Sequence, residues 1–209
     1  MKSAERRTHW DTVYTTKAAD AVSWFQREPT QSLTLLHRFG LTPHSCVIDV
    51  GGGDSHLVDH LIREGCTCVT VLDVSEAALK RAQERLGDHA RRVEWLVADV
   101  TGTWSVAPRD FWHDRAVFHF LTDAADRARY IDHMRRVMKP GGKVVIATFA
   151  LDGPEKCSGL PVARYSPETL AHELGSDFKL VEHEPEAHRT PGGGVQSFVY
   201  SVFTFALGS

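Results

Sequence analysis

The stretch VIDVGGGDS, residues 47–55, decides the fold expected for this chain. Its β-branched residues at 47, 48 and 50 suit a strand that is covered on both faces. Glycines 51–53 have no Cβ, so the backbone can turn sharply there and a ligand can lie against it. Apolar residues then recur at helical spacing over 57–62. Strand, glycine turn and helix in this order predict the nucleotide-binding entry to a doubly wound α/β sheet.

Two carboxylates flank the glycine turn and indicate what it binds. Asp49 precedes the first glycine by two residues, and Asp54 follows the last. A turn that holds a pyrophosphate uses backbone N–H groups at a helix N-terminus, and two carboxylates would repel that anion. We therefore expect S-adenosylmethionine, which carries a sulfonium and an ammonium and has no phosphate. For Asp54 and Ser55, capping of the following helix is an equal alternative.

The composition favours one globular domain with no general attraction to nucleic acid or to a membrane. The 209 residues suffice for one sizeable core, and the formal net charge is −3. No apolar run approaches the roughly 20 residues that span a bilayer, and residues 1–7 lack the apolar core of a signal peptide. The four cysteines show neither a disulfide framework nor metal-ligand spacing. We expect a cytoplasmic protein with free thiols and no metal site, either a monomer or a homodimer.

Carboxylates also end the second and third predicted strands. Residues 68–73 form a strand that ends in Asp73, and residues 93–100 form one that ends around Asp99. A carboxylate after the second strand can accept hydrogen bonds from both hydroxyls of a ribose, and helix capping is the alternative. The carboxylate after the third strand can reach an adenine amino group or can cap a turn.

The fourth strand and its exit, residues 111–121, bring further polar side chains to the same crevice. Asp114, Arg115 and His119 are candidates because ligands bind where strand exits converge on one edge of such a sheet. His119 is the preferred base, or the hydrogen-bond partner of a methyl acceptor, and His188 and Gln196 come next because the last hairpin could close over the crevice. A core histidine bonded to the backbone is the alternative interpretation.

The remaining pattern completes one α/β domain without repeats or long linkers. Residues 1–30 carry aromatic side chains in a polar segment. We expect Trp24 and Phe25 to pack against the domain. Trp10 and Tyr14 either do the same or form a lid that excludes water from the reaction. The other predicted elements are helices over 31–40 and 123–138, a break at 139–142, a strand over 143–149, an irregular segment over 152–161, a short helix from Ser166, and strands over 178–181 and 196–203 joined by a hairpin at 191–194.

Four motifs together resemble the class I S-adenosylmethionine-dependent methyltransferases. They are Asp-x-Gly-x-Gly after the first strand, an acid after the second, Ala-Asp after the third and Lys-Pro-Gly-Gly before the fifth. The resemblance covers the chain from about residue 9 and implies a single domain over 1–209, with 1–30 as a lid. It implies a Rossmann-like, doubly wound, seven-stranded sheet whose last strand is antiparallel. The implied cofactor-binding set is Trp10, Tyr14, Asp49, Gly51, Gly52, Gly53, Asp73, Val74, Ala98, Asp99, Val100 and Asp114.

The motifs around the fourth strand resemble two branches of that family. Asp114-Arg115 with Arg127 and Tyr130 is similar to thiopurine S-methyltransferase-like enzymes. The aromatic pattern before residue 26 resembles protein lysine methyltransferases of the translation-factor group. Those carry Asp-Lys-Gly where this chain has Asp-Arg-Ala at 114–116.

Methyl transfer from a sulfonium is an in-line displacement, so an enzyme must mainly align the acceptor with the methyl group. We expect a small-molecule acceptor, with a thiol or another soft nucleophile slightly preferred. A protein lysine N-methyltransferase is the alternative, and a non-catalytic S-adenosylmethionine-binding module is a third hypothesis. A multi-cysteine arsenic site is disfavoured. The candidate catalytic residues are His119, Asp114, Arg115, Cys157 and His188.

Overall fold

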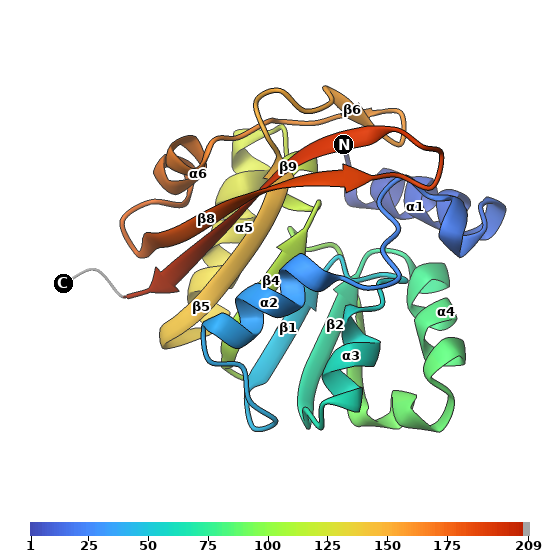
Figure 1. Ribbon diagram of the computed structural model, residues 1–209, viewed down its shortest axis with the longest axis horizontal. Coiled ribbons are helices and arrows are strands. Elements are labelled where there is room, and N and C mark those ends of the chain that lie inside the picture. The colour runs from blue at the N-terminus through green and yellow to red at the C-terminus, as the bar shows by residue number, and fades with distance from the viewer. Residues whose placement is uncertain (207–209) are drawn as a thin grey trace.

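The computed structural model describes residues 1–206 and contains one seven-stranded sheet with helices on both faces (Figure 1). Strands β1 to β5 are parallel, and β9 runs antiparallel to both β5 and β8. The predicted doubly wound sheet with an antiparallel last strand is confirmed. The spatial order is β3 (Val93–Val97), β2 (Cys68–Asp73), β1 (Cys46–Val50), β4 (Arg109–Arg115), β5 (Met138–Phe149), β9 (Val195–Phe205) and β8 (Phe178–Arg189).

The helices divide the core into two layers, one on each face of the sheet. Val47 of β1 packs in the cluster that contains Leu61, whereas the next residue, Ile48, packs in the cluster that contains Met134. This alternation explains why the central strands are almost continuously apolar. No helix within residues 1–206 has the length and hydropathy that a bilayer crossing needs. The helices are α1 (Ser3–Thr16), α2 (Thr30–Arg38), α3 (Leu57–Arg63), α4 (Glu76–Leu86), α5 (Ala124–Val137) and α6 (Pro167–Leu174), with short 3-10 turns η1 (Ala19–Ala21), η2 (Gly87–Arg92) and η3 (Phe118–Phe120).

The predicted end of the helix at the 139–142 segment is confirmed, but the predicted start of the next strand at 143 is wrong, because residues 139–142 already belong to β5. Helix α5 ends at Val137, and β5 begins at the next residue. The pairing of β4 with β5 shifts register between Arg109 and Phe111, so the Lys-Pro-Gly-Gly segment bulges out of the ladder. A Cβ at Gly142 would lie 2.8 Å from the carbonyl oxygen of Lys139, so the bulge requires glycine there.

The final hairpin is longer than predicted. Strand β8 continues to Arg189 rather than ending near 181, and β9 starts at Val195. The turn between them is the predicted one. The N-terminus of α6 is also confirmed, since the Ser166 side chain accepts a hydrogen bond from the backbone N–H of Thr169 and Pro167 is the first helical residue.

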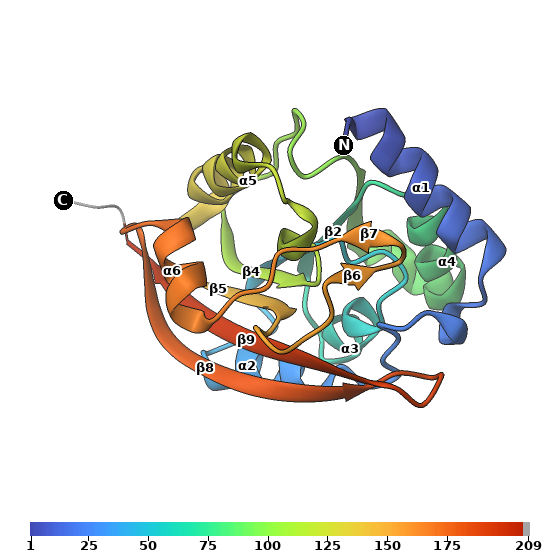
Figure 2. The same cartoon turned by 90° about the horizontal axis from the view of Figure 1, so that it is seen from above.

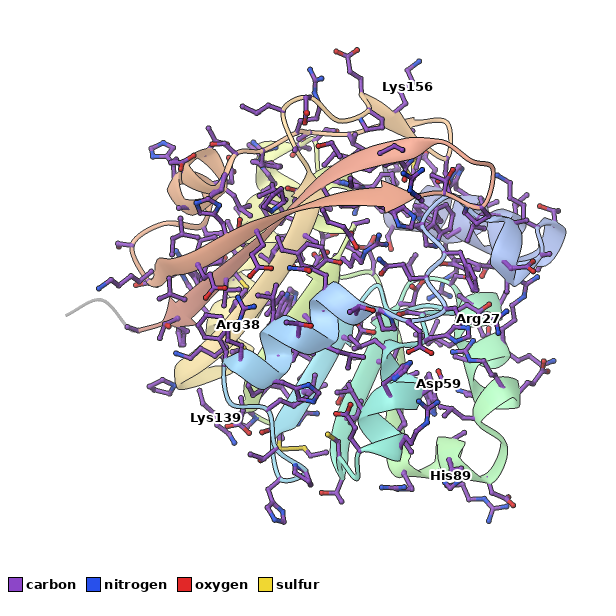
Figure 3. The ribbon with its side chains drawn as sticks, in the orientation of Figure 1. Arg27, Arg38, Asp59, His89, Lys139 and Lys156 are labelled. Atoms are coloured by element: carbon purple, nitrogen blue, oxygen red, sulfur yellow. A yellow bond between two sulfur atoms is a disulfide. The ribbon has the colours of Figure 1, made fainter. Side chains whose placement is uncertain are left out.

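The segment 152–161, predicted to hold no regular element, contains a small antiparallel ribbon. Strands β6 (Lys156–Cys157) and β7 (Leu160–Pro161) pair with each other. Ser158 and Gly159 between them have φ values of 48° and 79°, the geometry of a tight two-residue hairpin. Seen from above, the ribbon and α1 lie over the carboxyl ends of the parallel strands (Figure 2). Lys156 is exposed and points away from the sheet (Figure 3).

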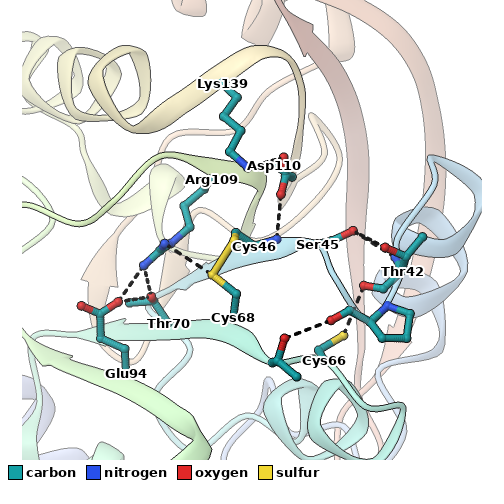
Figure 4. The surroundings of a disulfide bond; sticks show 12 residues. Thr42, Ser45, Cys46, Cys66, Cys68, Thr70, Glu94, Arg109, Asp110 and Lys139 are labelled. Atoms are coloured by element: carbon teal, nitrogen blue, oxygen red, sulfur yellow. Dashed lines mark hydrogen bonds and ion pairs between the residues drawn. A yellow bond between two sulfur atoms is a disulfide. The ribbon is translucent and has the colours of Figure 1, made fainter.

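The expectation of four free thiols is wrong, because Cys46 and Cys68 form a disulfide (Figure 4). The two residues are register partners on the neighbouring strands β1 and β2, with Cα atoms 4.6 Å apart. They lie at the starts of these strands, away from the glycine turn. Their 22-residue separation in sequence carried no sign of this pairing, since strand register is a tertiary property. Cys66 and Cys157 are free and buried.

Candidate active site

The glycine turn after β1 is shaped by close approach of side chains to its backbone. Gly51 and Gly53 have positive φ values of 64° and 46°. A Cβ at Gly52 would lie 2.5 Å from Oδ2 of Asp49, and one at Gly53 would lie 2.9 Å from Oδ2 of Asp73. Glycine is therefore needed for two reasons: the backbone conformation, and room for two carboxylates against the turn.

A cavity of about 350 Å³ opens at the carboxyl ends of the parallel strands. Residues from the turn, from the ends of β2, β4 and β5, from α1 and from the β6–β7 ribbon line it. A second hollow of about 60 Å³ adjoins it, and Tyr14, Trp24, Gly51 and Arg115 line both. Of the predicted cofactor set, Trp10, Tyr14, Gly51, Asp73, Val74, Ala98, Asp99 and Val100 line the larger cavity, and Asp49 and Gly52 line the smaller.

Asp49 is a buried carboxylate with one oxygen free. Nδ1–H of His113 donates to its Oδ1 over 2.7 Å, and Nε2 of His113 is 2.8 Å from Oγ of Ser32. Oδ2 of Asp49 is buried without a partner among the described residues. An unpaired buried carboxylate oxygen is costly unless a donor or cation meets it. The geometry thus fits the expected ammonium ligand.

Asp73 ends β2 and faces the larger cavity. The backbone N–H of Ser75 donates to its Oδ1 over 2.7 Å, so the capping contact raised as an alternative is present. That bond leaves Oδ2 available for a ribose hydroxyl. Burial raises the pKa of Asp73 to about 7, and the nearby charges of Asp49 and Asp11 add to this effect.

We expect S-adenosylmethionine binding to release a proton from Asp73 near pH 7. A cation and two hydroxyl donors favour the ionised carboxylate, so the ligand lowers a pKa that burial had raised. Affinity should rise as the pH increases from 6 to 8. Calorimetric titrations in two buffers of different ionisation enthalpy measure the release. The Asp73→Asn protein should bind weakly with no proton release, and an unchanged release in that variant would contradict the role.

Asp99 is engaged by the protein on both oxygens. The backbone N–H and the hydroxyl of Thr101 donate to Oδ1, and the guanidinium of Arg6 lies 3.1 Å from Oδ2. Although burial raises the pKa of Asp99, the hydrogen bonds from Thr101 and the charge of Arg6 bring it below its usual range. Arg6 also pairs with Asp126. Asp99 therefore caps a turn, as its alternative interpretation proposed, and an adenine contact stays a prediction.

The N-terminal segment contains a helix that its sequence does not reveal. Helix α1 buries only Val13 and Tyr14, so no apolar stripe marks it. It docks through Asp11, whose Oδ1 accepts a hydrogen bond from the Ser75 hydroxyl over 2.6 Å at the start of α4. Its Trp10 ring lies 5.1 Å from that of Phe120, between centroids. Burial raises the pKa of Tyr14 well above its ordinary value, so the phenol stays neutral.

Asp54 and Ser55 have structural contacts in this conformation. Asp54 pairs with Arg85, and Nη1 of Arg81 lies 3.9 Å from its Oδ2. The Ser55 hydroxyl accepts a hydrogen bond from the backbone N–H of Leu57 over 3.1 Å. Ser55 thus bonds to the first N–H of α3 from the position before its N-cap, His56, whereas Asp54 joins the turn to α4.

Asp114 lies inside the fold and does not line the cavity. It accepts hydrogen bonds from the Tyr130 hydroxyl over 2.6 Å and from the backbone N–H groups of Val117 and Phe118 over 2.8 and 3.0 Å. Burial raises the pKa of Asp114 to about 6. Its observed contacts hold the exit of β4 in place.

Arg115 and Cys157 are the candidate catalytic residues that line the cavity. Arg115 donates from Nε to the Tyr200 hydroxyl and from Nη1 to the Trp24 carbonyl, and it lies 4.6 Å from the centroid of the Phe198 ring. These contacts connect β4 with β9 and the N-terminal segment. Burial raises the pKa of the Cys157 thiol, so it stays protonated.

His119 and His188 lie behind the cavity wall rather than on it. Nδ1 of His119 accepts from the backbone N–H of Phe149 over 3.3 Å, so a neutral ring carries its proton on Nε2, which is buried and has no hydrogen-bond partner in the described part of the chain. Burial, together with the charge of Arg115, lowers the pKa of His119 to about 3. The alternative, a core histidine bonded to the backbone, matches this geometry. His188 bonds through Nε2 to the Ser23 carbonyl.

Several cavity residues were missing from the predicted set. Arg6, Phe120, Phe149 and Phe198 line the cavity. They come from α1, η3, β5 and β9, which are far apart in sequence. Gln196, which was a candidate because the last hairpin could close over the crevice, also lines the cavity, and Phe198 lies two residues after it on the same strand.

The residues present fit S-adenosylmethionine. The unpaired oxygen of Asp49, the glycine turn and Asp73 lie together at the carboxyl ends of β1 and β2, as the ammonium, the sulfonium-bearing chain and the ribose of this ligand require. S-adenosylmethionine supplies an electrophilic methyl group on sulfur. Asp49 and Asp73 would hold its two ends, and Trp10 and Trp24, which line the cavity, would exclude water from it.

Comparisons with known proteins agree with the geometry. A family model described as "Methyltransferase domain" matches residues 47–142. The ubiquinone/menaquinone biosynthesis C-methyltransferase UbiE of Acidiphilium cryptum is 29% identical over 109 residues, which cover 52% of this chain and 43% of that protein. The eEF1A lysine and N-terminal methyltransferase of Bos taurus is 23% identical over 185 residues, which cover 85% of this chain and 26% of that protein. The chain spans less than half the length of these two curated relatives.

Among solved structures, the N-methyltransferase NodS from Bradyrhizobium japonicum WM9, in complex with S-adenosyl-L-homocysteine, has the same fold. The TM-score between that structure and this chain is 0.68, with 20% sequence identity, and the match covers 93% of this chain and 97% of that one. The family model runs from β1 into β5 and thus includes the glycine turn and the strand ends that bear Asp73 and Asp99. Residues 47–142 therefore match a methyltransferase domain, and the fold of residues 1–206 is that of methyltransferases that use S-adenosylmethionine.

Proposed function

We propose that this protein transfers a methyl group from S-adenosylmethionine to a small molecule bound beneath α1 and the β6–β7 ribbon. The observation that carries the proposal is the covered, mainly apolar part of the cavity beyond the cofactor residues. Phe149, Leu160 and Phe198 line that part, together with Trp24 and Phe120. Concave sites with apolar walls and a few polar groups are typical of small-molecule binding.

The charges lining the cavity support a small acceptor over a protein lysine. Its carboxylates, Asp73, Asp99 and Asp126, lie on the cofactor side, and the last two pair with Arg6. At the acceptor side the charged group is the guanidinium of Arg115, which would repel a lysine ammonium. An open acidic channel is what a lysine substrate would need.

The chain's contribution to the reaction is alignment rather than proton removal. Tyr14 and Cys157 both line the cavity with raised pKa values, so neither is a base at neutral pH. The acceptor atom must therefore arrive with a free lone pair, as a thiolate or an unprotonated nitrogen does. Correct positioning of such a nucleophile can contribute roughly 7–11 kcal/mol to lowering the barrier. This favours the soft nucleophile that the sequence suggested.

A protein lysine N-methyltransferase is the second candidate function. The specific observation in its favour is the match to the lysine and N-terminal methyltransferase of Bos taurus, which covers 85% of this chain. A lysine side chain would have to pass the ribbon and displace or bypass Arg115.

Release of S-adenosylhomocysteine with a panel of acceptors tests the proposal. We expect turnover with small thiols or heterocyclic nitrogens and background release with lysine peptides, because the acceptor site is covered and lacks a free carboxylate. Calorimetry should show binding of S-adenosylmethionine and none of NAD. Turnover confined to lysine peptides would favour the second candidate, and a protein that does not bind S-adenosylmethionine would refute both.

A further inference from the structure

Gln196 presents an unused amide to the acceptor side of the cavity. It lines the cavity, and its Oε1 is buried without a partner among residues 1–206. Its Nε2 likewise makes no hydrogen bond in the described part of the chain. A primary amide offers one acceptor and two donors on adjacent atoms. Leaving a buried acceptor unpaired is unfavourable unless a ligand meets it.

The position of this amide is fixed by the last hairpin. Gln196 pairs with His188 across the β8–β9 ladder, and Phe198 pairs with Phe149 on β5. Because side chains alternate along a strand, Gln196 and Phe198 point to the same face of β9. The amide is therefore held beside an aromatic wall by two rigid ladders.

The walls around the amide are aromatic and nearly continuous. The ring centroids of Phe149 and Phe198 are 4.7 Å apart, and those of Trp10 and Trp24 are 5.7 Å apart. All four rings line the cavity. Such rings stack well on a flat, polarisable ligand. Arg115, the charged side chain on this side of the cavity among residues 1–206, is bonded to Tyr200, Trp24 and Glu186, so its guanidinium is not free to select an anion.

We infer that the methyl acceptor is a planar heterocycle with a hydrogen-bond donor next to an acceptor on one edge, as in a lactam or an amidine, and that Gln196 recognises that edge. The inference rests on the proposed function and adds the substrate class. The amide oxygen of Gln196 accepts from the ligand N–H, and its NH₂ donates to the neighbouring carbonyl or ring nitrogen. Gln196 acts here in specificity, not in the transfer itself.

Two matched probes test this edge. Calorimetry with protein saturated with S-adenosylhomocysteine compares 2-quinolone, which has the lactam edge, with N-methyl-2-quinolone, in which the donor is blocked. We expect the wild type to prefer 2-quinolone by about tenfold, the usual size of a lost buried hydrogen bond with its unpaired partner. Gln196→Leu should bind both compounds equally, and Gln196→Glu, which keeps only the acceptor, should retain part of the preference.

Val195→Ala is the control, because Val195 is the preceding residue and its side chain is exposed. It should keep the wild-type preference. The inference is overturned if the wild type shows no preference, including no binding of 2-quinolone, or if Gln196→Leu keeps it. Unchanged S-adenosylhomocysteine affinity in Gln196→Leu shows that the variant folds. A wild type that binds S-adenosylmethionine but ignores the lactam edge would refute the inference alone, whereas failure to bind S-adenosylmethionine would refute the proposed function.

Discussion

Asp49→Ala is expected to weaken S-adenosylmethionine binding by about ten- to a hundredfold, since a hydrogen bond to a charged group contributes roughly 1.5–3 kcal/mol. Oδ2 of Asp49 is buried and has neither a hydrogen-bond donor nor a cation beside it among residues 1–206, whereas Oδ2 of Asp54 lies 3.9 Å from Nη1 of Arg81. Loss of Asp49 therefore removes the counter-charge of the ligand ammonium. It also leaves Nδ1–H of His113 without its acceptor. Calorimetric titration with S-adenosylmethionine and with S-adenosylhomocysteine measures the effect.

The matched control is Asp54→Asn, five residues further along the same turn. Asp54 already pairs with Arg85 and lies near Arg81, so it should contribute little to the ligand. We expect less than about a threefold change in affinity, below the 1.4 kcal/mol that a tenfold change represents. A large loss in Asp54→Asn together with a small loss in Asp49→Ala would reverse the assignment of the two acids.

Asp114→Ala should destabilise the fold by about 3–5 kcal/mol, the size expected when a buried charged partner is removed from its donors. The Tyr130 hydroxyl and the backbone N–H groups of Val117 and Phe118 would lose their common acceptor. Chemical denaturation without ligand measures this. An Asp114→Ala protein of wild-type stability would refute this structural role and would favour a role in the site.

The pH dependence of stability separates this buried charge from its hydrogen bonds. The pKa of Asp114 is about 6 in the folded chain, against 3.8 as the ordinary value. Between these values the native state binds more protons than the unfolded state, so this group lowers the stability of the fold as pH rises from 4 to 6. Asp114→Asn cannot ionise. The stability of Asp114→Asn relative to the wild type should therefore improve as the pH rises from 4 to 6. A difference in unfolding free energy between the two proteins that does not change over this interval would contradict the raised pKa of Asp114.

The sheet and the cofactor end of the site followed from local sequence. The run of β-branched residues into glycines 51–53 predicted a strand and a turn, and the carboxylates of Asp49 and Asp73 sit at strand ends that topology brings together. These features are short and periodic, so each can be recognised without knowing what packs against it. Strand ends shifted by a few residues, as at β3 and β8, because edge pairing rather than composition sets them.

The residues at the acceptor end of the site could not be predicted from local sequence in the same way. Among the candidate catalytic residues, Arg115 and Cys157 line the cavity, whereas Asp114, His119 and His188 lie behind it. A strand exit places a residue within reach of the crevice, but side-chain direction there depends on the turn that follows. At β4 that turn has Ala116 at a φ of 71°, which redirects the next residues inward.

The sequence by itself determined the order of the seven strands of the main sheet and of the helices between them, the glycine turn and the class of ligand charge, because these depend on residues close together in the chain. It did not predict α1 or the β6–β7 ribbon. Tertiary structure alone decided the Cys46–Cys68 disulfide and the ion pair of Arg6 with Asp99. Each of these joins segments whose relative register and direction are set by packing of the whole sheet. Contacts of that kind have no local pattern, since their partners become neighbours only when the core has formed.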